Sequence, residues 1–82
     1  MIVHTKDIVL TPRLCKAARA LLGWTSHDLA EYCGVSGTTI RIFESDARGI
    51  NRMTMFCIIR AFTDAGIEFL PGGVVLRELE AA

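Results

Sequence analysis

Residues 25–44 read TSHDLAEYCGVSGTTIRIFE, and this stretch predicts two short helices joined by a tight glycine turn. Thr25, with Asp28 three residues later, is typical of a capping box, in which each side chain satisfies a free backbone amide at a helix start. Gly34 stands where the chain must leave that helix with a positive φ, which glycine adopts without a steric penalty. The first half of the stretch is therefore a helix that ends at a turn.

The second half predicts another helix at residues 36–45. Ser36 is a second N-cap, and Ile40 and Phe43 follow at the spacing of a buried helical stripe. An ordinary corner between two helices also contains a glycine. The small Ala30, the Gly-Val-Ser turn and the Thr-Ile pair fall together at the required offsets, however, and they favour a helix-turn-helix. In that motif the second helix enters the DNA major groove.

The longer stretch GWTSHDLAEYCGVSGTTIRIFE, residues 23–44, resembles the phage-repressor-type (Cro/cI, or XRE-like) helix-turn-helix transcriptional regulators. The likeness extends back through residues 17–22 and forward to about Phe69. It implies a mainly α fold, a four-helix lambda-repressor-like DNA-binding domain. One position departs from the family pattern, because Ser26 stands where the family has a glutamine.

The rest of the chain divides around this motif. Thr11 and Pro12 begin a first helix that runs to residue 22, and Thr54 is expected to cap a fourth helix at residues 55–65. Residues 11–66 thus form the DNA-binding domain. Residues 1–10 are expected to be an N-terminal arm or strand. Residues 67–82 contain two β-branched and aromatic runs around Pro71-Gly72-Gly73, which predicts a β-hairpin that serves as a dimerisation element.

The recognition helix has a predicted DNA-reading face that consists of Gly37, Thr38, Arg41 and Ile42. Thr38 can donate to a phosphate or touch a thymine methyl group. Arg41 can bind guanine O6 and N7 or grip a phosphate. Ile42 can contact thymine methyl groups or pack on the following loop, and Gly37 lets the backbone approach DNA closely. These residues are the candidates for base reading.

A second set of polar and basic side chains is assigned to the DNA phosphates. Ser26 takes the position of the family glutamine, and because its reach is shorter, His27 can substitute for it. Arg48 and Arg52 flank the loop after the recognition helix, where they position the protein without reading sequence; solvated loop charges are the alternative. The full set is Ser26, His27, Ser36, Ser45, Arg48 and Arg52.

Three further residues are given structural roles. In the resembled family an arginine at the site of Arg19 pairs with the glutamate that ends the recognition helix, here Glu44. This implies an ion pair that fixes the first helix against the third. Trp24 is expected to be a core aromatic that packs over the first helix.

Composition points to one small domain that self-associates. The chain has 82 residues with 51% hydrophobic content, so a dimer that hides part of this surface is expected. Three cysteines without CxxC spacing favour small buried thiols in a reducing cytoplasm over disulfides or zinc. No apolar run approaches the ~20 residues of a membrane span, and the start MIVHTKDIVL lacks a signal-peptide layout.

The net charge is zero, but its distribution is uneven. Residues 11–25 carry three basic side chains and no acidic one, whereas residues 64–82 carry four acidic side chains and one arginine. A basic half on a neutral chain suits a protein with one anionic partner face.

The sequence therefore predicts a sequence-specific transcriptional regulator that binds double-stranded DNA as a homodimer on an inverted repeat, without a cofactor. The alternative is an antitoxin-like or other protein-interaction module, whose hydrophobic C-terminal half binds a regulatory partner protein. An enzyme is not expected, because His4 and His27 lie in no recognisable catalytic motif.

Overall fold

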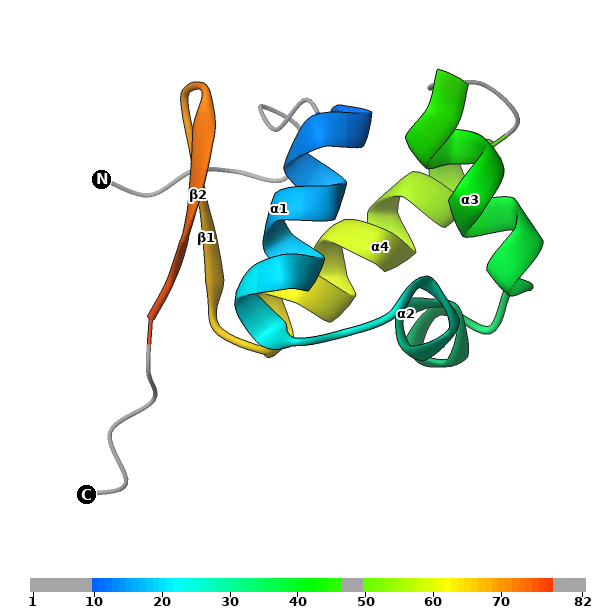
Figure 1. Ribbon diagram of the computed structural model, residues 1–82, viewed down its shortest axis with the longest axis horizontal. Helices are drawn as coiled ribbons and strands as arrows, with labels where there is room; N and C mark the ends of the chain where they lie inside the picture. Colours follow the sequence, from blue (N-terminus) through cyan, green and yellow to red (C-terminus); the bar gives the residue numbers. More distant parts are fainter. Residues whose placement is uncertain (1–9, 47–49, 78–82) are drawn as a thin grey trace.

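A computed structural model of the chain describes residues 10–46 and 50–77. This part is mainly helical, with a small antiparallel hairpin at its C-terminal end (Figure 1). The elements are α1 (Pro12–Leu22), α2 (Ser26–Cys33), α3 (Gly37–Asp46), α4 (Arg52–Asp64), β1 (Ile67–Leu70) and β2 (Gly73–Leu76). Apart from Leu10, which is buried, the expected N-terminal arm or strand lies outside the described residues.

Local hydrogen bonds explain where the first two helices begin and end. Thr11 Oγ1 accepts from the amide of Leu14, and Pro12 follows at the first helical position. Thr25 and Asp28 form the predicted capping box. Both helices end at a glycine in the left-handed region, Gly23 with φ 71° and Gly34 with φ 70°. These boundaries are set by contacts within a few residues of chain.

The start of α4 differs from the prediction. The cap is Asn51, whose Oδ1 accepts from the amide of Thr54 at 2.8 Å, and the helix runs over Arg52–Asp64. Thr54 is thus the third helical residue, and the assignment of the cap to it was wrong. Because Asn51 already satisfies the amide of Thr54, the helix gains three residues at its start.

The core lies at the centre of the domain, between the four helices and the inner face of the hairpin. Ile40 and Phe43, which the sequence placed on the inward stripe of α3, are buried there, and so are Ile58 and Phe62 of α4. The other buried apolar residues are Leu10, Cys15, Ala18, Leu29, Ala30, Ile59, Ile67 and Phe69.

The hairpin stands on the side of α1 away from α3 (Figure 1). Its strands pair in the register Ile67 with Leu76 and Leu70 with Gly73, so the turn is Pro71-Gly72 and the second glycine belongs to β2. Strand β1 packs on α4 and β2 packs on α1. The ring of Phe69 meets Phe62 edge-on at 6.2 Å. One face of the hairpin is thus covered by helices of the same chain.

Candidate nucleic-acid interface

Helices α2 and α3 are joined by a short turn in which the amides of Gly34 and Val35 donate to carbonyls of α2. The amide of Gly34 donates to the carbonyls of Ala30 and Glu31. The amide of Val35 donates to the carbonyl of Ala30 at 3.1 Å. Ser36 Oγ then accepts from the amide of Thr39 at 3.1 Å, which caps α3. The start of α3 is therefore held in place by α2 through consecutive backbone contacts.

Helix α3 has two different faces. Ile40 and Phe43 are fully buried and Glu44 is nearly so, whereas Thr38 and Arg41 are exposed. Glu44 therefore belongs to the inward face. The outward face is the one on which the sequence placed base reading, and it remains accessible in the folded chain.

Arg41 lies back over the first turn of its own helix. Its Nη2 donates to Thr38 Oγ1 at 3.2 Å. A Cβ built on Gly37 would lie 3.8 Å from Arg41 Nη1 and 3.9 Å from the Cα of His27. Three predicted reading residues and the start of α2 thus meet at one place. A guanidinium beside the free amides of a helix N-terminus favours an anionic or acceptor-rich ligand.

Ile42 lies next to this group, with 49% of its surface exposed. One of its two predicted roles, contact with thymine methyl groups, needs such exposure. The other, packing on the following loop, involves residues 47–49, which lie outside the described part of the chain.

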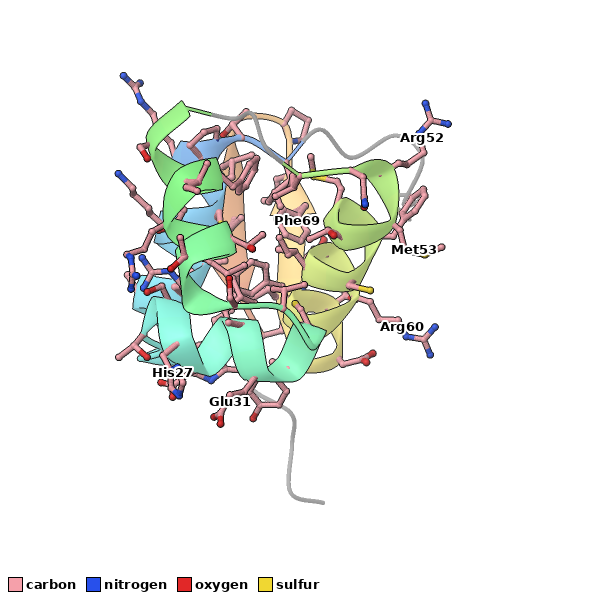
Figure 2. All side chains as sticks on the ribbon, turned by 90° about the vertical axis from the view of Figure 1, so that its right-hand side faces the viewer. His27, Glu31, Arg52, Met53, Arg60 and Phe69 are labelled. Carbon is pink, nitrogen blue, oxygen red and sulfur yellow. The ribbon has the colours of Figure 1, made fainter. Side chains whose placement is uncertain are left out.

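Two of the predicted phosphate residues open α2. Ser26 is its first residue and is half-buried, and His27 follows with an exposed ring. His27 Nε2 lies 3.8 Å from Glu31 Oε2, one helical turn later. His27 and Glu31 lie together at the edge of this face (Figure 2). A phosphate at the start of α2 would replace the carboxylate of Glu31 as the partner of His27.

The two serines of α3 have different hydroxyl partners. Ser36 Oγ shares a hydrogen bond of 3.0 Å with Thr39 Oγ1, in which either oxygen can donate. Ser45 Oγ donates to the carbonyl of Arg41 at 2.7 Å. The hydroxyl hydrogen of Ser45 is therefore used inside the helix, and Ser45 would contact a phosphate only after breaking that bond.

Of the two predicted basic loop residues, the structure describes only Arg52. Arg48 lies outside the described residues. Arg52 is the first residue of α4, and its side chain points away from α3, on the same side as Met53 and Arg60 (Figure 2). Lys16, an exposed residue of α1, is a further cation, and its charge helps to lower the pKa of Glu44. Sequence spacing did not reveal it, because α1 and α3 meet only through the fold.

Arg19 and Glu44 form an ion pair between α1 and α3. Arg19 donates to both carboxylate oxygens, from Nη2 and from Nε, at 2.7 Å each, and the side chains are only 19% and 6% exposed. The Nη1 atom of Arg19 donates to the carbonyl of Trp24 at 3.0 Å, and Cys15 Sγ donates to Glu44 Oε2 at 3.0 Å. The pair therefore connects α1, α3 and the link before α2.

The protonation states follow from these contacts. Burial would raise the pKa of Glu44, but the hydrogen bonds from Arg19 and Cys15 outweigh it and hold the pKa below its ordinary value of 4.5. The carboxylate in turn raises the pKa of Arg19. Burial, and then the neighbouring carboxylate, raise the pKa of Cys15. The cluster is thus a carboxylate, a guanidinium and a neutral thiol.

The environments of the remaining aromatic and sulfur groups differ partly from expectation. The Trp24 ring stacks on Tyr32 at 4.4 Å and lies 5.8 Å from Phe62, so it packs against α2 and α4.

Cys15 is buried and Cys33 half-buried, but Cys57 is exposed, so the expectation that all three thiols are buried was wrong. Cys57 lies on α4 and lines an open hollow together with Trp24 and Tyr32.

Two features of the described residues bear on other kinds of site. No group of three or more histidine, cysteine or acidic residues is placed to hold a metal ion within residues 10–46 and 50–77. Over the same residues, no helix combines the length and apolar character needed to cross a membrane. No protein-family model matches the sequence, and no curated protein matches it.

Proposed function

We propose that the chain is a sequence-specific DNA-binding transcriptional regulator with a lambda-repressor-like domain of the Cro/cI type, in which α2 and α3 are the helix-turn-helix. The observation that carries the proposal is the outward face of α3. Thr38, Arg41 and Ile42 are exposed there, while the opposite face is fixed in the core and by the ion pair of Glu44. A rigid helix with an exposed arginine near its start suits a major groove.

In this proposal the group around Arg41 reads bases. The guanidinium exchanges its hydrogen bond to Thr38 for guanine O6 and N7, and the released hydroxyl donates to a phosphate or meets a thymine methyl group. Ile42 adds an apolar contact beside it. The absence of a side chain at Gly37 leaves room for the sugar-phosphate backbone at the helix start.

Phosphate contacts hold the helix in the groove. Ser26 and His27 at the start of α2 and Ser36 at the start of α3 lie at helix N-termini, where free amides favour phosphate. A homodimer on an inverted repeat would place two recognition helices one DNA turn apart, roughly 34 Å.

The experiment is selection of bound fragments from the source genome, followed by fluorescence anisotropy on the enriched site and on a scrambled duplex. Arg41→Ala should reduce the preference for the enriched site, at a cost of about 1–3 kcal/mol for one lost bidentate contact. Arg77→Ala is the matched control, because Arg77 is also exposed but directly follows β2, on the side of α1 away from α3. It should leave the preference unchanged.

Salt dependence provides a second readout. The logarithm of the binding constant for any duplex should fall linearly with the logarithm of salt concentration. His27→Ala should weaken the enriched and scrambled duplexes alike, because a phosphate contact carries no sequence information. If Arg41→Ala and His27→Ala both bind like the wild type, the DNA proposal is wrong and the protein-interaction alternative gains support.

A further inference from the structure

Glu31 stands at an unfavourable position of α2. The helix runs over Ser26–Cys33, so Glu31 lies in its last turn, where the backbone carbonyl groups form the negative end of the helix dipole. The other acidic residue of the helix, Asp28, lies in the first turn and is part of the capping box. Asp28 thus stabilises α2, whereas the charge of Glu31 opposes the dipole.

The contact of Glu31 with His27 does not compensate for this position. The distance from His27 Nε2 to Glu31 Oε2 is 3.8 Å, and the two side chains are 75% and 70% exposed. A pair so exposed contributes little to stability. A cationic residue four positions ahead of an acidic one is also the less favourable order on a helix. The stability of α2 therefore does not explain a carboxylate at position 31.

The partner of Glu31 is a side chain that the proposed function assigns to a DNA phosphate. His27 lies beside Glu31 (Figure 2). A Cβ built on Gly37, at the start of α3, would lie 3.9 Å from the Cα of His27. The carboxylate of Glu31 thus lies beside a phosphate-binding candidate next to the recognition helix.

We propose that Glu31 competes with DNA phosphate for His27, and so lowers the affinity for every duplex alike. This inference rests on the proposed function, because it concerns a contact of the same interface. When a phosphate binds the imidazole, Glu31 loses its partner, and its charge stays beside the DNA backbone and repels it. Neither effect depends on the bases. A larger share of the remaining affinity therefore comes from the base-reading contacts of α3.

The competition also changes the salt dependence. A cation that binds a phosphate releases counterions from the DNA, which adds about 0.9 to the slope of log binding constant against log salt concentration. In the wild type, the freed carboxylate of Glu31 takes up a cation from solution, and this uptake offsets the release. Glu31→Gln abolishes the uptake, so the slope should become steeper by about 0.9.

Fluorescence anisotropy of the full chain on the enriched and the scrambled duplex tests the inference. The titrations are made at about pH 6, within the range in which imidazoles take up a proton. Glu31→Gln should raise the affinity for both duplexes at least about threefold. Glu68→Gln is the matched control, because it removes one negative charge from β1, on the side of α1 away from α3 (Figure 1). It should leave both affinities and the slope unchanged, because salt screens distant charges.

A double variant separates the competition from general repulsion. In the background of His27→Ala, the gain from Glu31→Gln should be clearly smaller than in the wild type, because no imidazole remains for which the carboxylate competes. An equal gain in both backgrounds would show that the carboxylate acts on the DNA directly, and it would overturn the proposal. So would an affinity of Glu31→Gln that is unchanged or lower than that of the wild type.

The results also distinguish this inference from the proposed function. If Arg41→Ala and His27→Ala both bind like the wild type, the proposed function fails. If they weaken binding while Glu31→Gln changes nothing, only the role of Glu31 is wrong.

The melting temperature provides a last check on the role of Glu31. Glu31→Gln should melt at the temperature of the wild type or slightly above it, because the substitution removes a charge that opposes the dipole. A fall of more than roughly 4 °C would show that the carboxylate supports α2, and it would overturn the proposal.

Discussion

Removing the carboxylate of Glu44 should destabilise the fold more than almost any other single change at a polar residue. Glu44→Ala removes three hydrogen bonds, two from Arg19 and one from Cys15, and leaves the guanidinium without its counter-ion. Breaking one partner of a buried ion pair costs about 3–5 kcal/mol. Because the Arg19 side chain is 19% exposed, water can reach part of it, and we expect the lower end, about 3 kcal/mol.

That loss is large for so short a chain. At 0.05–0.15 kcal/mol per residue, a domain of this length has a free energy of unfolding of roughly 4–12 kcal/mol. A loss of about 3 kcal/mol should lower the melting temperature by roughly 12–24 °C, which differential scanning calorimetry resolves easily. The double variant Arg19→Met with Glu44→Leu is the informative comparison. It removes both charges together. Its loss of free energy of unfolding should be at least about 2 kcal/mol smaller than the sum of the losses caused by Arg19→Met alone and Glu44→Leu alone.

The pH dependence has a definite sign. The pKa of Glu44 is below its ordinary value of 4.5 in the folded chain, so its contribution is present above pH 4.5 and is lost as the pH falls toward the folded pKa. The wild type should therefore lose stability below about pH 4.5 more steeply than the double variant. A loss below about 1 kcal/mol for Glu44→Ala, or additive costs in the double variant, would refute the reasoning.

Three further predictions follow from single contacts. Gly66→Ala should lower the free energy of unfolding in urea by at least about 2 kcal/mol, because φ is +103° and the new Cβ would lie 2.6 Å from a backbone oxygen at the end of β2. A loss of less than about 0.5 kcal/mol would show that the hairpin shifts freely. Asn51→Ala should cost about 1 kcal/mol and Thr54→Ala should cost less, and the reverse order would restore Thr54 as the cap. In the native state a thiol reagent should label Cys57 fast and Cys15 only on unfolding, because burial raises the pKa of the Cys15 thiol; equal rates would show that the two thiols are equally accessible.

Features fixed by nearby hydrogen bonds could be read from the sequence. The capping box of Thr25, the glycine that ends α2 and the cap at Ser36 each depend on partners within a few residues. The inward positions Ile40 and Phe43 follow from helical spacing alone. These local rules predicted α2, the turn, α3 and the outward face that carries the candidate site.

The features that sequence reasoning missed are of two kinds. In some, two local alternatives compete, and in others the outcome depends on contacts between residues far apart in the sequence. Asn51 and Thr54 are both good caps three residues apart, and local preference does not decide between them. The hydroxyl of Ser45 donates to a carbonyl of its own helix. From the sequence alone, a serine at this position fits that role and a phosphate contact equally well. The exposure of Cys57 depends on which side of α4 the other helices leave open, and no local pattern contains that information.

The two faces of α3 separate the residues that the fold requires from the residues that can be replaced without loss of stability. Ile40, Phe43 and Glu44 hold the helix in place, while the exposed side chain of Arg41 donates a hydrogen bond to that of Thr38 on the same outward face. Exchanging the outward residues therefore removes no contact that the core requires. If the outward face of α3 reads DNA as proposed, variants with other outward residues should select other duplexes while keeping the melting temperature of the wild type.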